Sequence, residues 1–255
     1  VLAERVGRTE EIIGTWLKAR GGRERLVLAT KVAGKGPIIR PGQKITAATM
    51  RAAVEASLKR LGTDYIDLYQ LHWPNRDSYH FRQMWAYDPR GIDKAAELAQ
   101  MAEILTEAQK LVAEGKIRAI GLSNETVWGA GRWIALAETM GLPRMASVQN
   151  EYSLLCRQFD TDWAELSVIE DLPLLAFSPL ATGLLSGKYA GDVTPPKTRR
   201  FHTPTLGGRI TPQVFPAVAA YLAVAQKHGL DPCQMAIAFT MTRPFRTIPI
   251  IGATT

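Results

Sequence analysis

Two spacings of apolar residues alternate along the chain and predict alternating helices and strands. Segments in which apolar residues recur at steps of three or four match one face of an α-helix. They cover 9–20, the stretch from Met50 to Leu61, 94–114, a stretch with Trp128 and Trp133 that ends at Gly141, 159–170, 211–228 and 231–243. Glycine or proline stands at most of their ends, as is usual for helix termini. We expect Ile12, Ile13, Trp16 and Leu17 to form the apolar stripe of the first helix, and Trp163, Leu166 and Ile169 to point inward from 159–170.

Short runs rich in β-branched and aromatic residues lie between the helical segments, and we interpret them as strands. They cover 26–31, 65–71, 117–122, 145–149, 173–177 and 247–251. This alternation predicts a parallel α/β protein. None of the strands is followed by the Gly-x-Gly-x-x-Gly turn of a doubly wound dinucleotide fold. We therefore predict the α/β class and a (β/α)8 TIM barrel, with six of the eight strands in this chain.

The two ends of the chain fit this interpretation. The chain begins with Val1 instead of a methionine, and it stops at Thr255 directly after an apolar run. We expect the two remaining strands and a closing helix to lie beyond these ends. Residues 1–255 would then form a single, incomplete barrel domain.

Polar or small residues stand at the end of every predicted strand. They are Lys31, His72, Ser123 with Asn124, Gln149 with Asn150, Ser178, and Gly252 with Thr254. In barrel enzymes the catalytic residues stand at the carboxyl ends of the strands. Taken alone, His72 is equally well a structural histidine, but six such ends in a row indicate a ring of functional groups on one face. We expect Lys31 and His72 to lie on neighbouring parallel strands at one rim.

Two stretches lack a periodic pattern, and we predict that both are loops. The first, 75–93, is polar and aromatic, and it is longer than most connections between a strand and a helix. The second, 187–210, is rich in glycine, proline, lysine and arginine. Long loops above a scaffold are commonly functional or disordered.

The composition is that of a globular protein without a membrane segment. Hydrophobic residues make up 46% and charged residues 22%, and no apolar run reaches membrane-spanning length. Cys156 and Cys233 stand far apart, so we expect free thiols in a cytoplasmic protein and no disulfide or metal site. The net charge of +7 comes from lysines and arginines that are scattered among acidic residues. We therefore predict no nucleic-acid or membrane partner, although a basic surface suits an anionic cofactor.

Six motifs in fixed order resemble the aldo-keto reductase family over essentially the whole chain. They are Leu-Ala-Thr-Lys31, Asp67-Leu-Tyr-Gln-Leu-His72, Gly121-Leu-Ser-Asn124, Val148-Gln-Asn150, Phe177-Ser-Pro-Leu180 and Ile251-Gly-Ala-Thr254. Leu-His72-Trp-Pro and Ser123-Asn-Glu-Thr126 are most similar to the bacterial Tas-like branch of the family. The resemblance implies an oxidoreductase that transfers a hydride between NADP(H) and a carbonyl or alcohol, with a small aldehyde or ketone as substrate.

The resemblance also implies catalytic roles. The family uses an aspartate, a tyrosine, a lysine and a histidine, and the last two correspond to Lys31 and His72. Lys31 would be the cation that favours the tyrosinate form of the general acid, whose unperturbed pKa is ~10. His72 would orient the carbonyl and assist proton transfer, since its unperturbed pKa of ~6.5 would let it donate near neutral pH. Nothing in Val1 to Gly7 matches the aspartate or the tyrosine, so we expect these 255 residues alone to be a poor catalyst.

The cofactor residues that the resemblance implies come from four strand ends and one loop. Ser123, Asn124 and Gln149 would bind the nicotinamide carboxamide, and Phe177 would stack on the nicotinamide ring. Ser178, Leu180 and Gly183 would approach the pyrophosphate, and Lys188 and Arg199 would bind phosphates. Gly252 begins the adenosine-phosphate segment, which continues in the family into a helix that follows Thr255. The register of Arg199 against Arg200 stays open, as does the choice of NADP over NAD.

Two other functions are compatible with the same residues. One is an NADPH-binding regulatory subunit like the potassium-channel β subunits, which share this fold. The other is an unrelated barrel enzyme in which Lys31 forms a Schiff base with its substrate. A plain surface role is the alternative for Lys31 and for Arg199. A homo-oligomer is compatible with the sequence, which does not name the substrate.

Overall fold

The computed structural model describes residues 6–36 and 42–252 of the chain. These residues fall into two compact units. Unit 1 holds the described residues up to Tyr79 and those from Met84 to Val148, and unit 2 holds His80–Gln83 and the described residues from Gln149 onward. The predictions for Val1 to Gly7 and for the motif ending at Thr254 fall largely on residues outside the described ranges.

Strands and helices alternate along the chain. Unit 1 contains α1 (Arg8–Arg20), η2 (Arg23–Arg25), β1 (Ala29–Val32), α2 (Ala47–Leu61), β2 (Ile66–Leu71), η3 (Pro89–Gly91), α3 (Lys94–Ala113), β3 (Ile117–Ser123) and α4 (Val127–Met140). Strand β4 (Val148–Gln149) contains the boundary between the units. Unit 2 contains η4 (Gln158–Asp160), α5 (Asp162–Ile169), β5 (Leu174–Phe177), η5 (Ala181–Ser186), η6 (Ala190–Asp192), α6 (Arg199–His202), α7 (Val214–Lys227), α8 (Pro232–Met241) and β6 (Thr247–Ile250).

The six strands form one sheet in which their order is the order of the sequence. The pairs β1–β2, β2–β3 and β5–β6 are parallel. A parallel sheet whose strands alternate with helices is the α/β arrangement of a (β/α)8 barrel. The predicted fold class is therefore confirmed.

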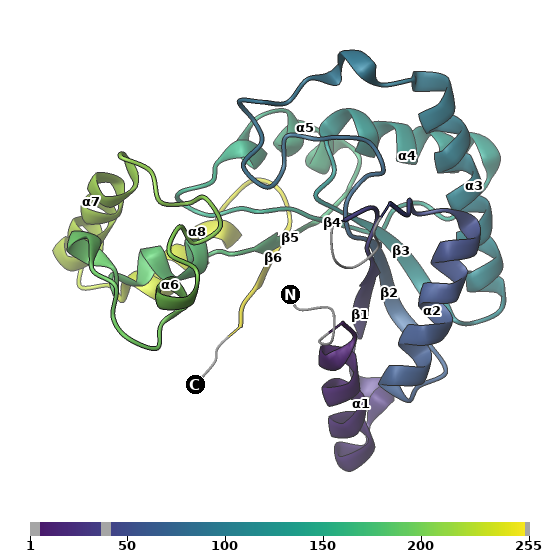
Figure 1. Ribbon diagram of the computed structural model, residues 1–255, viewed down its shortest axis with the longest axis horizontal. Helices are drawn as coiled ribbons and strands as arrows, with labels where there is room; N and C mark the ends of the chain where they lie inside the picture. The colour runs from purple at the N-terminus through teal and green to yellow at the C-terminus, as the bar shows by residue number, and fades with distance from the viewer. Residues whose placement is uncertain (1–5, 37–41, 253–255) are drawn as a thin grey trace. The chain divides into compact units, whose positions relative to one another are not determined.

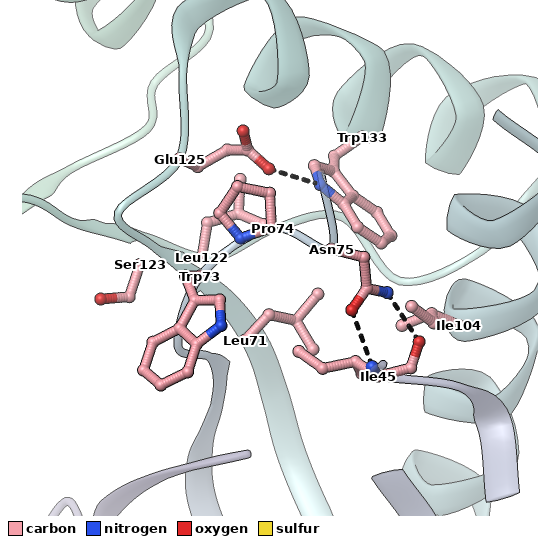
Figure 2. A pocket seen from close by; sticks show the side chains of 10 residues that line it. All are labelled: Ile45, Leu71, Trp73, Pro74, Asn75, Ile104, Leu122, Ser123, Glu125 and Trp133. Atoms are coloured by element: carbon pink, nitrogen blue, oxygen red, sulfur yellow. Dashed lines mark hydrogen bonds between the residues drawn. The ribbon is translucent and has the colours of Figure 1, made fainter. Parts of the chain in front are cut away.

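In unit 1 the two faces of the strands have different surroundings. Helices α2, α3 and α4 pack beside strands β1 to β3 (Figure 1). Leu71 and Leu122 point toward these helices, where they line a small cavity together with Ile104 and Trp133 (Figure 2). Because side chains alternate along a strand, Gln70 of β2 faces the opposite side of the sheet, together with its register partners Lys31 and Gly121.

Unit 2 is built around an aromatic core. The Tyr152 ring lies 5.9 Å from the ring of Phe239 and 5.6 Å from that of Phe245. Its hydroxyl donates a 2.7 Å hydrogen bond to the carboxylate of Asp160, which also accepts from Arg243 at 2.9 Å. Burial and the neighbouring carboxylate raise the pKa of the Tyr152 phenol, so it stays protonated. This cluster links the segment after β4 to α8.

Two predictions about helix faces are wrong in part. The stripe expected on α1 included Ile12 and Trp16, which are 58% and 45% exposed. The buried face is centred on Gly14 and Leu17 instead. A Cβ at Gly14 would lie 2.4 Å from the carbonyl oxygen of Arg60, so α1 approaches α2 through bare backbone. Ile169, expected to point inward from α5, is 71% exposed at the end of that short helix.

The two stretches without periodicity differ in the amount of structure they contain. Residues 75–93 contain turns and η3 only, as expected of an irregular connection. The stretch 187–210 contains η6 and α6, and it buries Tyr189, Arg200 and Leu206. The prediction of a plain loop is therefore incomplete there. The polar composition of the stretch did not indicate that these three widely spaced residues would be buried.

Candidate active site

Lys31 and His72 lie at the carboxyl ends of two neighbouring strands in unit 1. Lys31 of β1 pairs in register with Gln70 of β2. The backbone N–H of His72, just after β2, donates a 3.0 Å hydrogen bond to the carbonyl of Val32. Both side chains are partly buried. The prediction that these two residues occupy adjacent parallel strands at one rim is confirmed by this register.

Burial lowers the tendency of both side chains to carry a proton, and the charge of Lys31 adds to this effect at His72. Burial, and secondly the positive charge of Lys31, lower the pKa of His72 to about 4. The indole of Trp73 contributes to that burial, since its ring centroid lies 4.5 Å from the imidazole. Burial also lowers the pKa of Lys31. At neutral pH His72 is therefore a neutral imidazole with one N–H donor, and not an acid with a proton to release.

Ser123 and Asn124 stand directly beside this pair, at the end of β3. The Asn124 amide donates to the carbonyl of His72 at 2.9 Å and to the Ser123 hydroxyl at 3.2 Å. Both residues are buried. Asn124 has a left-handed backbone with a φ of 48°, a conformation that asparagine tolerates better than most residues. The structure thus brings four of the predicted residues, Lys31, His72, Ser123 and Asn124, to one rim of unit 1.

Unit 2 contains the other predicted residues. Phe177 ends β5, pairs in register with Ile250 of β6 and donates its N–H to the carbonyl of Asn150 at 3.1 Å. Gln149 and Phe177 are half-buried. The chain then turns sharply, because Ser178 has a left-handed backbone with a φ of 56°. Gly252 follows β6 and is exposed.

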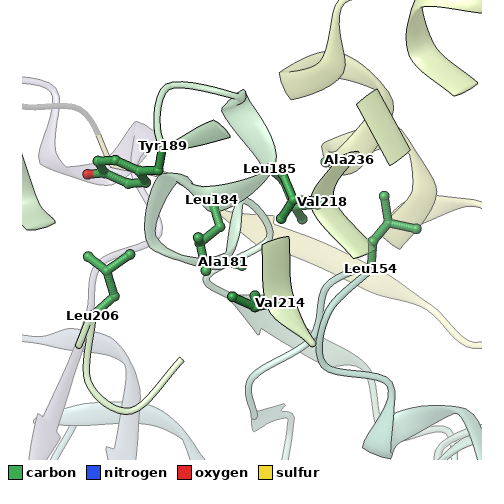
Figure 3. Packing of buried hydrophobic residues seen from close by; sticks show 9 residues of the cluster. All are labelled: Leu154, Ala181, Leu184, Leu185, Tyr189, Leu206, Val214, Val218 and Ala236. Atoms are coloured by element: carbon green, nitrogen blue, oxygen red, sulfur yellow. The ribbon is translucent and has the colours of Figure 1, made fainter. Parts of the chain in front are cut away.

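The loop after Phe177 is fixed by an apolar cluster beneath it. Ala181, Leu184 and Leu185 of η5 point into this cluster, which α7 completes (Figure 3). The cluster comprises Leu154, Ala181, Leu184, Leu185, Tyr189, Leu206, Val214, Val218 and Ala236, and Leu180 packs against it. Ala181, Thr182 and Gly183 all have positive φ. Apolar packing of Ala181, Leu184 and Leu185 therefore stabilises a turn with strained backbone angles.

Gly183 and Lys188 lie against each other on this loop. A Cβ at Gly183 would lie 2.6 Å from Cε of Lys188 and 3.0 Å from its ammonium nitrogen. The Lys188 side chain is exposed, and its ammonium lies 5.3 Å from the ring centroid of Tyr189. Bare backbone beside a cation is a suitable cradle for an anion.

The sequence left open whether Arg199 or its neighbour Arg200 is the candidate phosphate ligand, and the two side chains have different surroundings in the structure. Arg200 is buried, where its guanidinium donates to the carbonyl of Val193 at 2.8 Å and pairs with Asp192. Arg199 is exposed. Arg200 is therefore engaged within the loop, whereas Arg199 faces solvent.

Comparison with known sequences identifies the family to which the chain belongs. The sequence profile of the aldo/keto reductase family matches residues 5–255. The chain belongs to the aldo/keto reductase family. It is 44% identical to the Tas protein of Escherichia coli over 262 residues, which span 99% of this chain and 73% of Tas. It is 36% identical to an aldo-keto reductase of Babesia bovis, over 90% of this chain and 85% of that protein. It is also 29% identical to the aldo-keto reductase YhdN of Bacillus subtilis, over 97% of this chain and 67% of that protein.

Membership of the aldo/keto reductase family makes the chain an oxidoreductase that acts on a small molecule, and the predicted recognition is confirmed, including its similarity to Tas. Across residues 6–36 and 42–252, no helix is both long and apolar enough to traverse a bilayer.

Sequence reasoning missed two residues that the structure brings next to this aldo/keto reductase site. Arg76 and Glu125 form a buried ion pair directly behind His72 and Asn124. Glu125 stood in the motif Ser123-Asn-Glu-Thr126, which we used only as a marker of a branch. The available signal was a glutamate among buried positions, which requires a partner cation.

Proposed function

We propose that this protein transfers a hydride between NADP(H) and the carbonyl or alcohol carbon of a small aldehyde or ketone. When bound, the nicotinamide supplies or accepts the hydride. Reduction adds that hydride to the carbonyl carbon and a proton to the oxygen, so the protein must stabilise negative charge on the oxygen while the proton arrives.

The observation that carries this proposal is the pairing of Lys31 with a neutral His72. A neutral imidazole donates one hydrogen bond from its N–H, and this can orient a carbonyl oxygen. The partly buried ammonium of Lys31 stabilises negative charge on that oxygen, or on the family's general acid, more strongly than an exposed lysine would. Because the pKa of His72 is lowered to about 4, we assign His72 to orientation and not to proton donation at neutral pH. This revises the expectation that its ordinary pKa would allow it to donate.

The proposed cofactor contacts divide into three groups. Ser123, Asn124 and Gln149 would bind the carboxamide, and Phe177 would stack on the nicotinamide. Ser178, Leu180 and Gly183, with Lys188 and Arg199, would contact the phosphates, and Gly252 would approach the adenosine end.

The strained turn supports the phosphate assignment, because the missing side chain at Gly183 lets the Lys188 side chain lie directly against the backbone of the turn, where a Cβ would displace it. Three further observations are compatible with these assignments. Asn124 is buried with its amide committed to the rim, Phe177 is half-buried and Arg199 is exposed. The preference for NADP over NAD rests on family resemblance.

The test separates binding from chemistry. We expect Asn124→Ala to weaken NADPH binding by about 1–3 kcal/mol, the usual effect of removing a buried polar partner, measured by fluorescence titration. We expect His72→Gln and Lys31→Met to lower turnover of a reactive aldehyde by ~10²-fold or more with little change in NADPH affinity. Lys59→Met, on the exposed surface of α2, is the matched lysine control.

Two results would contradict the proposal. The first is a wild-type protein that does not bind NADPH. The second is turnover that is equal in wild type, His72→Gln and Lys31→Met. Borohydride trapping of a carbonyl compound on Lys31 would identify the Schiff-base mechanism instead.

A further inference from the structure

A buried ion pair joins the segment after β2 to the turn after β3. The Arg76 guanidinium contacts both carboxylate oxygens of Glu125, and the two side chains are only 4% and 2% exposed. The same guanidinium donates to the Thr126 hydroxyl at 2.9 Å and lies 3.8 Å from the carboxylate of Glu97 on α3. We call the Arg76–Glu125 contact the carboxyl-end pair.

The Glu125 carboxylate is fully occupied by donors. Besides Arg76, it accepts the backbone N–H of Thr126 at 2.7 Å and the indole N–H of Trp133 at 3.2 Å (Figure 2). Helix α4 leaves room for the pair at Gly129, where a Cβ would lie 2.2 Å from both the Arg76 guanidinium and the Glu125 carboxylate. A buried charge with this many matched partners has a single favourable geometry.

The carboxyl-end pair is continuous with the rim described above. Glu125 directly follows Asn124, whose amide holds the His72 carbonyl at 2.9 Å. Arg76 ends the segment that begins at His72. Within that segment, Asn75 exchanges two 2.7 Å hydrogen bonds with the backbone of Ile45 (Figure 2). The residues that follow Asn124 and those that follow His72 are therefore both held in place by polar contacts.

The space between these groups is almost completely filled. A cavity of about 20 Å³ remains, lined by Trp73, Pro74, Asn75, Ser123, Glu125 and Trp133 among others. This volume admits about one water molecule. The rim residues therefore have little room to shift while the carboxyl-end pair is intact.

We propose that Arg76 and Glu125 are positioning residues, which act through Asn124 and the His72 segment to hold the catalytic rim in its working geometry. The inference rests on the proposed function for its catalytic meaning. Its geometric content, that the pair keeps His72 partly buried beside Lys31, does not depend on any reaction.

Strands β2 and β3 themselves carry another ion pair, which serves as a matched control. At their amino ends, Asp67 of β2 binds Arg118 of β3 at 2.8 Å. Asp67 retains Arg23 at 2.7 Å and the N–H of Leu28 at 2.9 Å when Arg118 is removed. Arg118→Gln thus weakens a β2–β3 link at the end of the strands opposite to His72.

The experiment compares three folded variants. Arg76→Lys keeps the charge but loses the two-pronged contact, and Trp133→Phe removes one donor to Glu125 without leaving a lone charge. For each variant, together with Arg118→Gln, the His72 pKa is measured by NMR titration, with His72→Gln used to assign the signal. NADPH affinity and the KM and kcat of aldehyde reduction are measured in parallel.

We expect Arg76→Lys to raise the His72 pKa by about one unit or more, because the imidazole gains solvent and moves from Lys31. Trp133→Phe should shift it in the same direction by less, and Arg118→Gln should leave it unchanged. NADPH affinity should fall about tenfold in Arg76→Lys, because Asn124 loses its fixed position.

An unshifted His72 pKa in both folded variants would overturn the inference, as would an equal shift in Arg118→Gln. If Arg76→Lys does not fold, Trp133→Phe decides the question alone. A wild-type protein that binds no NADPH would refute the proposed function, while the titration would still test the positioning role.

Discussion

The lowered pKa of His72 makes the stability of this protein depend on pH in a way that one substitution should remove. The pKa is lowered to about 4, first by burial and then by the charge of Lys31, whereas an unfolded chain has a histidine pKa of ~6.5. Above that value neither state binds the proton, so the imidazole contributes no pH dependence. As the pH falls from 6.5 toward 4, the unfolded chain takes up a proton that the folded protein resists. The free energy of unfolding therefore decreases in this window.

The size of the effect follows from the two pKa values. At pH 5 the unfolded histidine is almost fully protonated and the folded one is mostly neutral, so the difference is roughly 2 kcal/mol relative to pH 7.5. Below pH 4 both states are protonated, and the loss levels off at about 3 kcal/mol. A loss of this size is a substantial part of the stability of an ordinary domain.

Urea unfolding of wild type and His72→Gln at pH 7.5 and pH 5 measures this quantity. Other titrating groups affect both proteins alike, so the difference between their pH-induced losses isolates His72. We expect wild type to lose about 2 kcal/mol more than His72→Gln. Lys31→Met should give an intermediate loss, because it removes the second cause of the shift and leaves the first.

Equal pH-induced losses in wild type and His72→Gln would refute the reasoning. That result would mean that the imidazole titrates in the folded protein near its ordinary pKa. It would also remove the argument that His72 is neutral when it orients the substrate.

Two further predictions concern unit 2. Tyr152→Phe should destabilise the protein by about 1–2 kcal/mol in urea unfolding, because Asp160 loses a buried donor while it keeps its arginine partners. The control is Tyr221→Phe, which removes a hydroxyl that donates to a backbone carbonyl. A smaller loss of stability in Tyr152→Phe than in Tyr221→Phe would contradict the prediction. Gly183→Ala should cost roughly 1–2 kcal/mol through its positive φ and should also weaken NADPH binding by displacing Lys188. Unchanged NADPH affinity in a folded Gly183→Ala protein would remove the loop from the proposed cofactor site.

The sequence predicted the strand order and the neighbouring positions of Lys31 and His72 because both depend on local periodicity. Runs of β-branched and aromatic residues between helical segments mark the strands and their carboxyl ends, and parallel strands bring these ends to the same rim. Helix faces were predicted less well. The exposure of Ile12 and Trp16 depends on a backbone contact at Gly14, which adds no apolar side chain to the pattern.

Contacts between distant segments could not be predicted from the sequence. Arg76 and Glu125 are 49 positions apart, and each alone reads as an ordinary surface charge. The neutrality of His72 was missed for the same reason, since it depends first on burial, to which the neighbouring Trp73 ring contributes, and then on the charge of Lys31 from another strand. The residue type alone suggested the ordinary histidine pKa, and burial together with the charge of Lys31 lowers it.

Gly129 has a consequence for how this protein can change by mutation. Alanine is normally better than glycine inside a helix by about 1 kcal/mol, yet here its methyl group would occupy the space of the carboxyl-end pair. Substitutions at positions 76, 125 and 129 should therefore show strong epistasis. Alanine at 129 should be harmful in the present background and neutral or beneficial once the pair is replaced by smaller side chains. A mutational path that exchanges the pair must shorten the two charged residues before the helix gains its methyl group, so the order of steps is constrained even though each step is a single residue.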